Sequence, residues 1–492
     1  DYKDFQDGFT YLIKSGLGSG KSFNTRQWIQ DNFDWLIHNR VFFLGYRNNL
    51  LLQECEKISH LTHIHQFAQY DSLSDPDLHA ALCLDSIIKF LNKPESFDGA
   101  VIILDEIVSV IKHLLFANTE IDKYREKAIT LFVEAIKRAR LVICLDGNMA
   151  DWVVEFMGGI CPDKKIQTIE NTYATPRPDI YWVEGSINTK DNGKGETFSD
   201  NDYRGIIDLI YGNPTNRIIP ETINAKAITS DSQTCLETID SLLTKDGKIT
   251  LRIDRTTAGG EIVKEFLADP VKWLLENKID YLLYSPTAES GLDIPIENYF
   301  AVHYCLFFGV LDTDSTLQMM ARIRDVACPK VVWARSWSTN QDDVKSPTSE
   351  VIKRAMDDRI RLDLDRALSG ETRGSEITSQ ILETFQRALA PLEDAAFKLL
   401  GQRNFEKSNY RECLLERLTA TGYQKVITLT PKVKDKGEQY KPEKLEVQIQ
   451  ESEAIFDAEI KPVNELNPDK LADQRSLRKI RILDQLPGID TV

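Results

Sequence analysis

The chain has 492 residues, of which 42% are hydrophobic and 28% charged, and its formal net charge is −16. This length suits about three domains with substantial cores, and no apolar run approaches the roughly 20 residues of a membrane span. The acidic balance excludes a protein whose whole surface binds nucleic acid, although a local basic groove stays compatible with it. The eight scattered cysteines form no Cys-x-x-Cys pair. They indicate reduced core residues, so we expect a cytoplasmic protein without a membrane partner.

A glycine-rich loop follows the first predicted strand, residues 11–13, and precedes a helix predicted to begin at Lys21. Glycines let backbone N–H groups point inward, and the helix N-terminus adds partial positive charge, so this loop can hold phosphates. Lys21 can reach the β- and γ-phosphates of a nucleotide, and the Ser22 hydroxyl can bind Mg²⁺. Ser15 stands where the common pattern has its first glycine. The predicted nucleotide-binding residues are Gly16, Gly18, Ser19, Gly20, Lys21 and Ser22. Because the loop comes so early and the chain does not begin with Met, we expect a part of a longer protein.

Short apolar strands alternate with helical segments in the first third of the chain. Strands are predicted at 40–46, 81–86, 100–104 and 141–145, and a long amphipathic helix at 121–140. This alternation predicts a parallel sheet that is covered by helices on both faces. In such sheets, ligands bind at the carboxyl ends of the strands.

Asp105 and Glu106 come directly after the predicted strand 100–104. At the end of a strand that follows a phosphate loop, Asp105 can bind Mg²⁺, and Glu106 can orient or deprotonate an attacking water. Taken by itself, an acidic pair at a strand end is more often a solvated pair. Combined with the phosphate loop, it favours an ATP hydrolase that uses Mg²⁺.

The second half of the chain repeats the alternation without a phosphate loop. Residues 181–220 are polar and irregular, and we predict a linker or insertion there. Strands are then predicted at 225–230, 249–253, 281–284 and 299–308. The pattern favours a second α/β domain that closes over the nucleotide of the first.

Gln318, Arg322 and Arg324 lie near the end of this second block. An arginine supplied from a second domain can stabilise charge on a transferring phosphoryl group, so we predict catalytic roles for these residues. The two arginines are two positions apart and would not share a face of a regular helix. One can then reach the γ-phosphate while the other pairs with an acid. A solvated arginine pair is the alternative.

The C-terminal part of the chain turns helical, with helices predicted at 351–368, 376–400 and 409–418. Gly422 and a strand-like segment, 423–429, follow. Helix, glycine and strand could form a winged-helix module, and a helical bracing domain is an equally open reading. Residues 431–449 are rich in Lys and Glu and indicate a solvated linker.

Taken in order, the motifs resemble those of superfamily-two helicases, most closely the herpesvirus origin-binding helicase and related cyanobacterial plasmid replication proteins. The residues that carry the resemblance are Ser15 to Ser22, Arg47-x-x-Leu50-x-x-Gln53, Asp105-Glu106, Asp146-Gly-Asn148, Ser290-Gly-Leu-Asp293-Ile and Gln318-Met-Met-Ala-Arg322-Ile-Arg324. The resemblance implies that Gly291 and Asp293 also contact the nucleotide. It further implies that a nucleic-acid strand is bound by Arg47, Asn48, Asp85, Ser86, Ser230, Arg255 and Thr287.

The resemblance implies an architecture of two tandem RecA-like domains, 1–180 and 221–340, joined by 181–220 and followed by a mainly helical domain, 341–492. It implies an ATP-dependent helicase or translocase that uses ATP and Mg²⁺ on nucleic acid, for which we expect single-stranded DNA or a replication origin. The expected setting is replication initiation of a plasmid or phage-like element, with a primase-like domain upstream. Two alternatives stay open: a nucleotide-gated origin-binding protein without processive unwinding, and the helicase module of a defence or restriction system.

Overall fold

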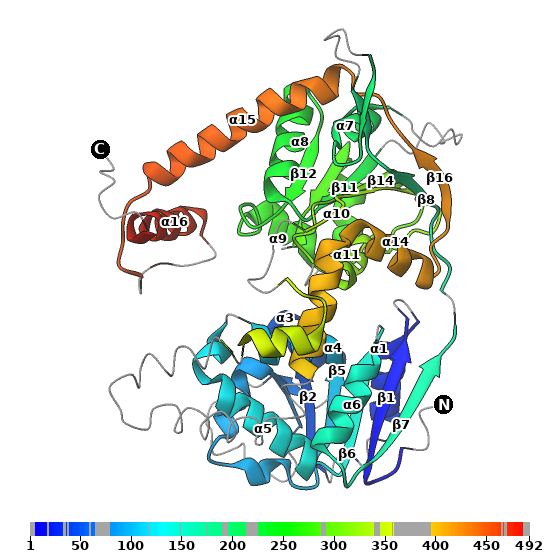
Figure 1. The fold of residues 1–492 in the computed structure, drawn as a ribbon, viewed down its shortest axis with the longest axis vertical. Helices are drawn as coiled ribbons and strands as arrows, with labels where there is room; N and C mark the ends of the chain where they lie inside the picture. The colour runs from blue at the N-terminus through cyan, green and yellow to red at the C-terminus, as the bar shows by residue number, and fades with distance from the viewer. Residues whose placement is uncertain are drawn as a thin grey trace. The chain divides into compact units, whose positions relative to one another are not determined.

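The computed structural model of the protein forms two compact units (Figure 1). One comprises residues 1–175 and 342–405, and the other comprises 176–341 and 406–492. The described residues are 5–16, 19–32, 36, 39–58, 61–63, 79–117, 119–147, 149–173, 175–188, 195–212, 225–286, 292–338, 345–356, 358, 395–463, 466 and 470–485, with the side chains of Ser22, Asn49, Leu50 and Gln53 left out.

The first unit is built on a seven-stranded sheet in which every pairing is parallel. Its order is β3-β4-β2-β5-β6-β1-β7. The strands are β1 (Phe9–Ser15), β2 (Val41–Gly45), β3 (Thr62–His63), β4 (His79–Cys83), β5 (Val101–Asp105), β6 (Leu141–Asp146) and β7 (Lys165–Asn171). The strands predicted in this part of the sequence are all present, and β3 and β7 are additional.

Helices cover both faces of this sheet because successive strand residues point to opposite sides. Leu12 and Phe42 belong to a core with the helices of one face, whereas Ile13 and Phe43 belong to a core with those of the other. The first face carries α4 (Ile107–Phe116), α5 (Arg125–Arg138), α6 (Asp151–Ile160) and the short η4 (Leu84–Phe90), η5 (Pro94–Phe97) and η6 (Glu120–Tyr124). The second face carries α1 (Lys21–Asp31) and α3 (Asn48–Lys57).

The second unit contains another seven-stranded, fully parallel sheet, ordered β12-β13-β11-β14-β15-β8-β16. Its strands are β8 (Ile180–Val183), β11 (Ala225–Ser230), β12 (Thr250–Ile253), β13 (Tyr281–Tyr284), β14 (Phe300–Phe307), β15 (Lys330–Ala334) and β16 (Lys425–Leu429). If the strands of each seven-stranded sheet are counted along the chain, both sheets read third, fourth, second, fifth, sixth, first, seventh. The predicted fold class, two tandem RecA-like domains with a helical C-terminal region, is confirmed.

The remaining elements of the second unit pack around this sheet or against its helices (Figure 1). They are the hairpin of β9 (Ser186–Asn188) and β10 (Thr197–Ser199), and the helices α7 (Arg204–Tyr211), α8 (Gln233–Lys245), α9 (Glu261–Ala268), α10 (Pro270–Asn277), α11 (Thr313–Met320), α14 (Tyr410–Ala420), α15 (Asp435–Phe456) and α16 (Leu471–Gln485). The long helix α15 packs along α7 and α8, where Glu443 accepts hydrogen bonds from Ser241 at 2.5 Å and Lys245 at 2.7 Å. Arg475 of α16 pairs with Glu451 of α15 at 2.6 Å.

Several segments predicted as irregular have regular structure. The stretch 181–220 holds most of β8, the β9–β10 hairpin and α7, while 431–449 lies largely within α15. The strand expected at 423–429 is present as β16, and it pairs with β8 at the edge of the second sheet. A wing of a separate module would instead pair within its own sheet.

Part of the C-terminal region belongs to the first unit. Ala395 and Leu399 are buried in the core on the α4–α6 face of the first sheet. Much of the helices predicted at 351–368 and 376–400 lies outside the described residues. Within the described ranges, no helix combines the length and the apolar content that crossing a membrane requires.

Candidate nucleotide-binding site

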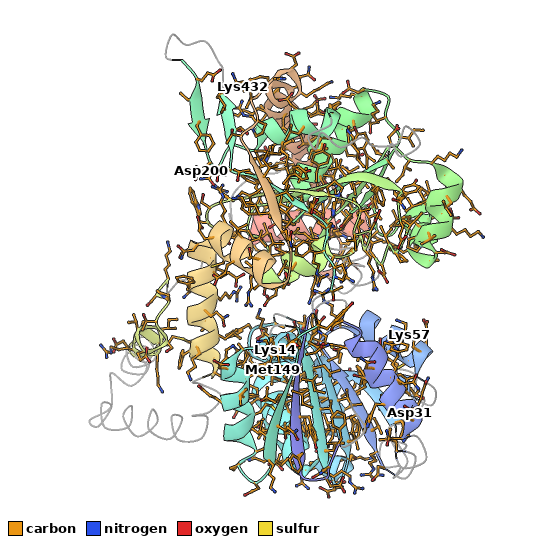
Figure 2. All side chains as sticks on the ribbon, turned by 90° about the vertical axis from the view of Figure 1, so that its right-hand side faces the viewer. Lys14, Asp31, Lys57, Met149, Asp200 and Lys432 are labelled. Atoms are coloured by element: carbon orange, nitrogen blue, oxygen red, sulfur yellow. The ribbon has the colours of Figure 1, made fainter. Side chains whose placement is uncertain are left out.

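The glycine-rich loop leaves the carboxyl edge of the first sheet, the edge at which Figure 2 labels Lys14 and Met149. Ser15 ends β1 and is 2% exposed. Its hydroxyl lies 2.6 Å from the Ser19 hydroxyl and accepts a 2.9 Å hydrogen bond from the Asn171 amide at the end of β7. The Ser19 hydroxyl donates to the Gly16 carbonyl at 2.5 Å. Ser15, the departure from the common pattern, therefore ties the loop to the neighbouring strand.

Gly20 lets the loop turn into α1. Its φ of 83° is left-handed, a conformation that side chains rarely adopt. Its carbonyl accepts the Asn24 N–H at 2.8 Å, which begins the helical hydrogen bonding. Lys21 is the first residue of α1, so the side chain starts at the positive end of the helix dipole. This arrangement suits an anion. Gly18 and the Ser22 side chain, also predicted to bind nucleotide, lie outside the described parts.

Asp105 ends β5 at the same edge of the sheet. Burial raises the pKa of the Asp105 carboxyl above its ordinary range, and the negative charges of Glu106, Glu54 and Asp146 raise it further. The positive charge of Lys21 opposes this shift. Three further carboxylates thus surround Asp105, within the electrostatic reach of Lys21. A concentration of negative charge of this kind can hold a divalent cation.

Glu106 sits in a left-handed backbone conformation, with φ 56° and ψ 58°, at the N-terminus of α4. This conformation is uncommon for a residue with a side chain, and the surrounding contacts hold it in place. The Glu106 carbonyl accepts from Val110 N–H at 2.9 Å. The carboxylate of Glu106 accepts a 2.9 Å hydrogen bond from the Tyr46 hydroxyl.

Two further acids brace these elements. Asp146 ends β6 and is 7% exposed, and its carboxylate accepts the Val108 N–H of α4 at 2.9 Å. Glu54 of α3 pairs with Arg26 of α1 at 2.9 Å. Asp146 therefore fixes the start of α4 behind Glu106, and the Arg26–Glu54 pair joins α3 to α1, the helix that follows the glycine-rich loop.

Asp85, predicted to contact nucleic acid, is surrounded by protein donors. His113 Nε2 lies 2.7 Å from one carboxylate oxygen, while the Thr119 hydroxyl and the Ile121 N–H donate to the other. Burial alone would raise the pKa of Asp85, but these hydrogen bonds outweigh it and hold the pKa well below its ordinary value. Cys83, Asp85 and His113 are groups that can bind a metal. Their hydrogen bonds to one another already account for their arrangement.

The other residues of the first unit that are predicted to contact a nucleic-acid strand follow β2 or β4. Arg47 precedes α3 and is half-buried, with its guanidinium 5.0 Å from the centre of the Tyr46 ring. Asn48 begins α3 and is exposed. Ser86 is only 5% exposed. Arg47 and Asn48 are therefore more accessible than Ser86.

In the second unit, α11 ends at Met320, before the two predicted arginines. Ile323 forms a parallel β-bridge with Ile294. The Ile294 N–H donates to the backbone carbonyl of Arg322, and the Arg324 N–H donates to the backbone carbonyl of Ile294. Arg322 and Arg324 therefore lie on either side of this bridge and outside α11, whereas we expected them on a helix.

The two arginines have different surroundings. Arg322 Nε is buried and has no hydrogen-bond partner among the described residues. Arg324 is 62% exposed, and its Nε pairs with Asp293 at 2.6 Å. Gln318 is half-buried on α11. An orphaned guanidinium nitrogen is the kind of group that an anionic ligand can satisfy.

A buried cluster of Lys330, His303 and Tyr284 contacts the end of α11, just before the two arginines. Lys330 Nζ donates to the Met320 carbonyl at 2.9 Å and lies 3.0 Å from His303 Nδ1. Burial lowers the pKa of Lys330. Tyr284 donates to the Met319 carbonyl at 3.0 Å. These side chains satisfy carbonyls at the C-terminal end of α11, so the helix stops at a defined place.

The remaining predicted contacts of the second unit differ in exposure. Ser230 is completely buried, and its hydroxyl accepts the Ser232 N–H at 3.1 Å. Arg255 is exposed in the turn after β12. Thr287 and Gly291 lie outside the described residues, as does Asn148 of the third motif.

Three residues at the first edge escaped the sequence-based site prediction: Tyr46, Asn171 and His113. Each acts through a contact with a residue distant in sequence, Glu106, Ser15 or Asp85. Only Tyr46 carried a signal, since it stands between a predicted strand and Arg47.

Residues 86–177 match the model of a family described as origin of replication binding protein. The chain is also similar to an uncharacterized protein of Picosynechococcus sp., with 25% identity over 458 residues, 85% of this chain and 40% of the relative. The predicted resemblance to origin-binding replication proteins is thereby confirmed.

Two viral relatives carry names that describe replication. A putative helicase/primase complex protein of African swine fever virus is 21% identical over 326 residues, which cover 64% of this chain and 28% of the relative. A putative replication origin binding protein of Escherichia phage T5 is 24% identical over 310 residues, which cover 60% of this chain and 28% of the relative. The chain therefore spans two fifths or less of the length of these relatives.

Proposed function

We propose that the protein is an ATP-driven translocase or helicase that acts on DNA during replication initiation. One observation carries the proposal: the first sheet brings Lys21, at the start of α1, within electrostatic reach of Asp105, which is followed by Glu106. A phosphate-binding helix terminus, a metal-binding carboxylate and a water-orienting carboxylate are the parts that ATP hydrolysis needs.

Asp105 and the Ser22 hydroxyl would hold Mg²⁺, which supplies positive charge beside the β- and γ-phosphates. The observed surroundings of Asp105 fit a divalent cation, because Glu106, Glu54 and Asp146 crowd negative charge against it and raise its pKa. Gly16, Gly18, Ser19 and Gly20 cradle the phosphates through backbone N–H groups. Lys21 binds the terminal phosphates, and Glu106 orients the attacking water.

The second unit supplies the cationic part of the proposed site. Arg322 is our first choice for the residue that contacts the γ-phosphate, because its Nε lacks a partner among the described residues. Arg324 and Asp293 form an ion pair that can open when a nucleotide binds, and Gln318 and Gly291 complete this side. An arginine that closes on a triphosphate couples hydrolysis to a change in domain arrangement.

We assign the contacts with a nucleic-acid strand to Arg47, Asn48, Arg255 and Thr287. Of the three that the structure describes, Arg47 is half-buried and Asn48 and Arg255 are exposed. Asp85, Ser86 and Ser230 would then act by shaping the strand ends behind these contacts. The name of the phage relative favours a replication origin as partner, and the name of the viral relative favours action together with a primase.

Substitution of Glu106 by Gln tests the hydrolysis step. The Glu106→Gln variant should bind a labelled ATP analogue as the wild type does, while its ATP turnover falls by about 100-fold or more. Glu126→Gln, at an exposed glutamate of α5, is the matched control and should behave as wild type. ATP hydrolysis is measured with and without single-stranded DNA. If the wild-type rate of ATP hydrolysis is the same with and without single-stranded DNA, the proposed translocase function is overturned.

The second candidate is an origin-binding protein that uses nucleotide only as a conformational clamp. The description of the matching family favours it. The same variant separates the two candidates, because a clamp needs nucleotide binding but no turnover. Binding of duplex origin DNA that survives in Glu106→Gln, together with an absence of strand separation by the wild type, would favour the clamp.

A further inference from the structure

Tyr46 lies directly between two residues of the proposed machinery. It follows β2, and its hydroxyl donates a 2.9 Å hydrogen bond to Glu106 Oε2. A hydrogen bond to a charged carboxylate is directional, so it fixes where the carboxylate oxygens point. The left-handed backbone of Glu106 already limits the directions in which this side chain can leave the chain. Tyr46 is therefore placed to select one orientation of Glu106.

The same tyrosine ring is in contact with a candidate strand-binding residue. The Arg47 guanidinium lies 5.0 Å from the centre of the Tyr46 ring, within the range of a cation–π interaction. A phosphate group competes with an aromatic face for a guanidinium, because the phosphate bond is charge-assisted and bidentate. Binding of a strand at Arg47 would thus change the contact that holds the Tyr46 ring.

A second connection reaches the ring from another strand end. The His113 ring centre lies 6.5 Å from that of Tyr46, and His113 Nε2 is 2.7 Å from Asp85. Asp85 in turn receives the N–H of Ile121 and the hydroxyl of Thr119. The Tyr46 ring is therefore bordered by Arg47 and by a histidine that the Asp85 network holds in place. If Arg47 moves away, the Tyr46 ring loses its contact on that side, while His113 stays in place on the other side.

We propose that Tyr46 is a positioning residue that makes the orientation of Glu106, and hence ATP hydrolysis, depend on nucleic acid at Arg47. This inference rests on the proposed function and adds the route by which a bound strand regulates the hydrolytic site. Both contacts lie within the first unit, between the carboxyl ends of β2 and β5. The coupling therefore acts separately from the arginines of the second unit.

Replacement of Tyr46 by Phe removes the hydroxyl and keeps the ring beside Arg47 and His113. The readout is the stimulation ratio, which is kcat for ATP hydrolysis with saturating single-stranded DNA divided by kcat without it. We expect this ratio to fall at least about fivefold, the lower end of common coupling between two sites. The KM for ATP should stay within about twofold, because Lys21 and the glycine-rich loop are unchanged. Tyr124→Phe, at an exposed tyrosine of η6, is the matched control and should keep the wild-type ratio.

A double-mutant cycle with Arg47→Ala locates the route. If Arg47 acts through the Tyr46 hydroxyl, the double variant should show the same stimulation ratio as Arg47→Ala, so that the two changes are not additive. Additive losses would overturn the route, as would a wild-type ratio in Tyr46→Phe. A general loss of folding would lower both rates and raise the KM for ATP, and a thermal melting curve identifies it. If single-stranded DNA does not stimulate ATP hydrolysis by the wild type, both the proposed translocase function and the proposed coupling are overturned. If Glu106→Gln lacks ATP turnover but Tyr46→Phe keeps the wild-type stimulation ratio, only the coupling is overturned.

Discussion

The two sheets share one strand order, yet among the described residues only the first sheet has a carboxyl edge suited to phosphate. β1 and β8 occupy the same place in their sheets, next to the last strand of the unit. A side chain at Gly16, after β1, would meet no atom of the described residues within 4 Å, whereas one at Gly185, after β8, would collide with the backbone of Ser199. The glycine of the first unit leaves room for a ligand, and that of the second lets a hairpin pack. The loops that follow equal strands, rather than the sheets, separate a nucleotide-binding unit from its companion.

The next equivalent pair, β5 and β14, differs in the same way. β5 leads into Asp105 and Glu106, but β14 leads into Phe308 and Gly309. Asp231 accepts the Phe308 N–H at 2.7 Å, and Gly309 has φ 73° against the backbone of Ser338. This edge of the second sheet is used for packing between its own loops. The described residues that the second unit would contribute to nucleotide chemistry are instead Gln318 on α11, Arg322 and Arg324 after it, and Asp293.

The largest effect expected from this difference concerns Lys21. Lys21→Ala should abolish nucleotide binding by the whole chain and reduce ATP hydrolysis by at least about 1000-fold, because the sequence of the second unit contains no second glycine-rich loop followed by Lys-Ser or Lys-Thr. Binding of a fluorescent ATP analogue measures this, with Lys127→Ala at an exposed lysine of α5 as the control. Retention of about half of the bound analogue would show that the second sheet also binds nucleotide.

The two arginines sharpen the comparison within the second unit. Arg322→Ala should lower kcat about 1000-fold, the lower end of the effect of a catalytic arginine. Arg324→Ala should lower it only about tenfold, because Arg324 is largely exposed and already paired with Asp293. Steady-state ATP hydrolysis with single-stranded DNA compares the variants, with Arg481→Ala in α16 as the control. Equal losses in the two variants would contradict the difference in their surroundings.

The smallest effect concerns Asp85 and Asp231, two carboxylates that follow strands of the two sheets. Their pKa values are shifted in opposite directions. Hydrogen bonds hold the pKa of Asp85 well below its ordinary value, whereas burial raises that of Asp231 to about 6. Asp85 therefore contributes stability that is present above pH 4 and is lost only as the pH falls through its folded-state pKa. The contribution of Asp231 is full below about pH 4 and is lost as the pH rises through about 6.

Asp85→Asn should consequently destabilise the first unit by about 1–3 kcal/mol, equally at pH 7 and pH 5. For Asp231→Asn, the wild type should gain about 1 kcal/mol over the variant between pH 7 and pH 5. Peptide-resolved hydrogen exchange in urea reports the free energy of unfolding of each unit. A difference for Asp85→Asn that changes over this range would contradict the direction of its pKa.

Much of the fold could be predicted because its buried strands are short apolar runs that end in polar residues. The runs at 100–104 and 141–145 correspond to β5 and β6, and 281–284 to β13. β7 escaped prediction because most of its residues are exposed and polar, as suits an edge strand. The stretch 431–449 was read as a linker from its charges, although Tyr440 packs against Tyr203 and makes it a helix of the second unit.

The candidate site divides in the same manner. Lys21, Asp105 and Glu106 could be predicted because their spacing along strands and loops carries the chemistry. Arg322 and Arg324 were expected on a helix, and the sequence could not reveal that Lys330, ten residues beyond Met320, ends that helix by donating to its carbonyl. The contact between Lys330 and Met320 joins residues that are not neighbours in sequence, so no local sequence pattern predicts it.

β16 is the last strand of the second sheet, and between β15 and β16 the chain passes through the first unit. The two units are consequently interleaved along the polypeptide. During synthesis the ribosome must release Ala395 and Leu399 before the first core can be filled, and Leu429 before the second sheet can acquire its outer strand. Until then the outer side of β8 offers unpaired backbone groups to other nascent chains. No single cut of the gene separates two complete folding units, so each half expressed alone would need a piece of the other.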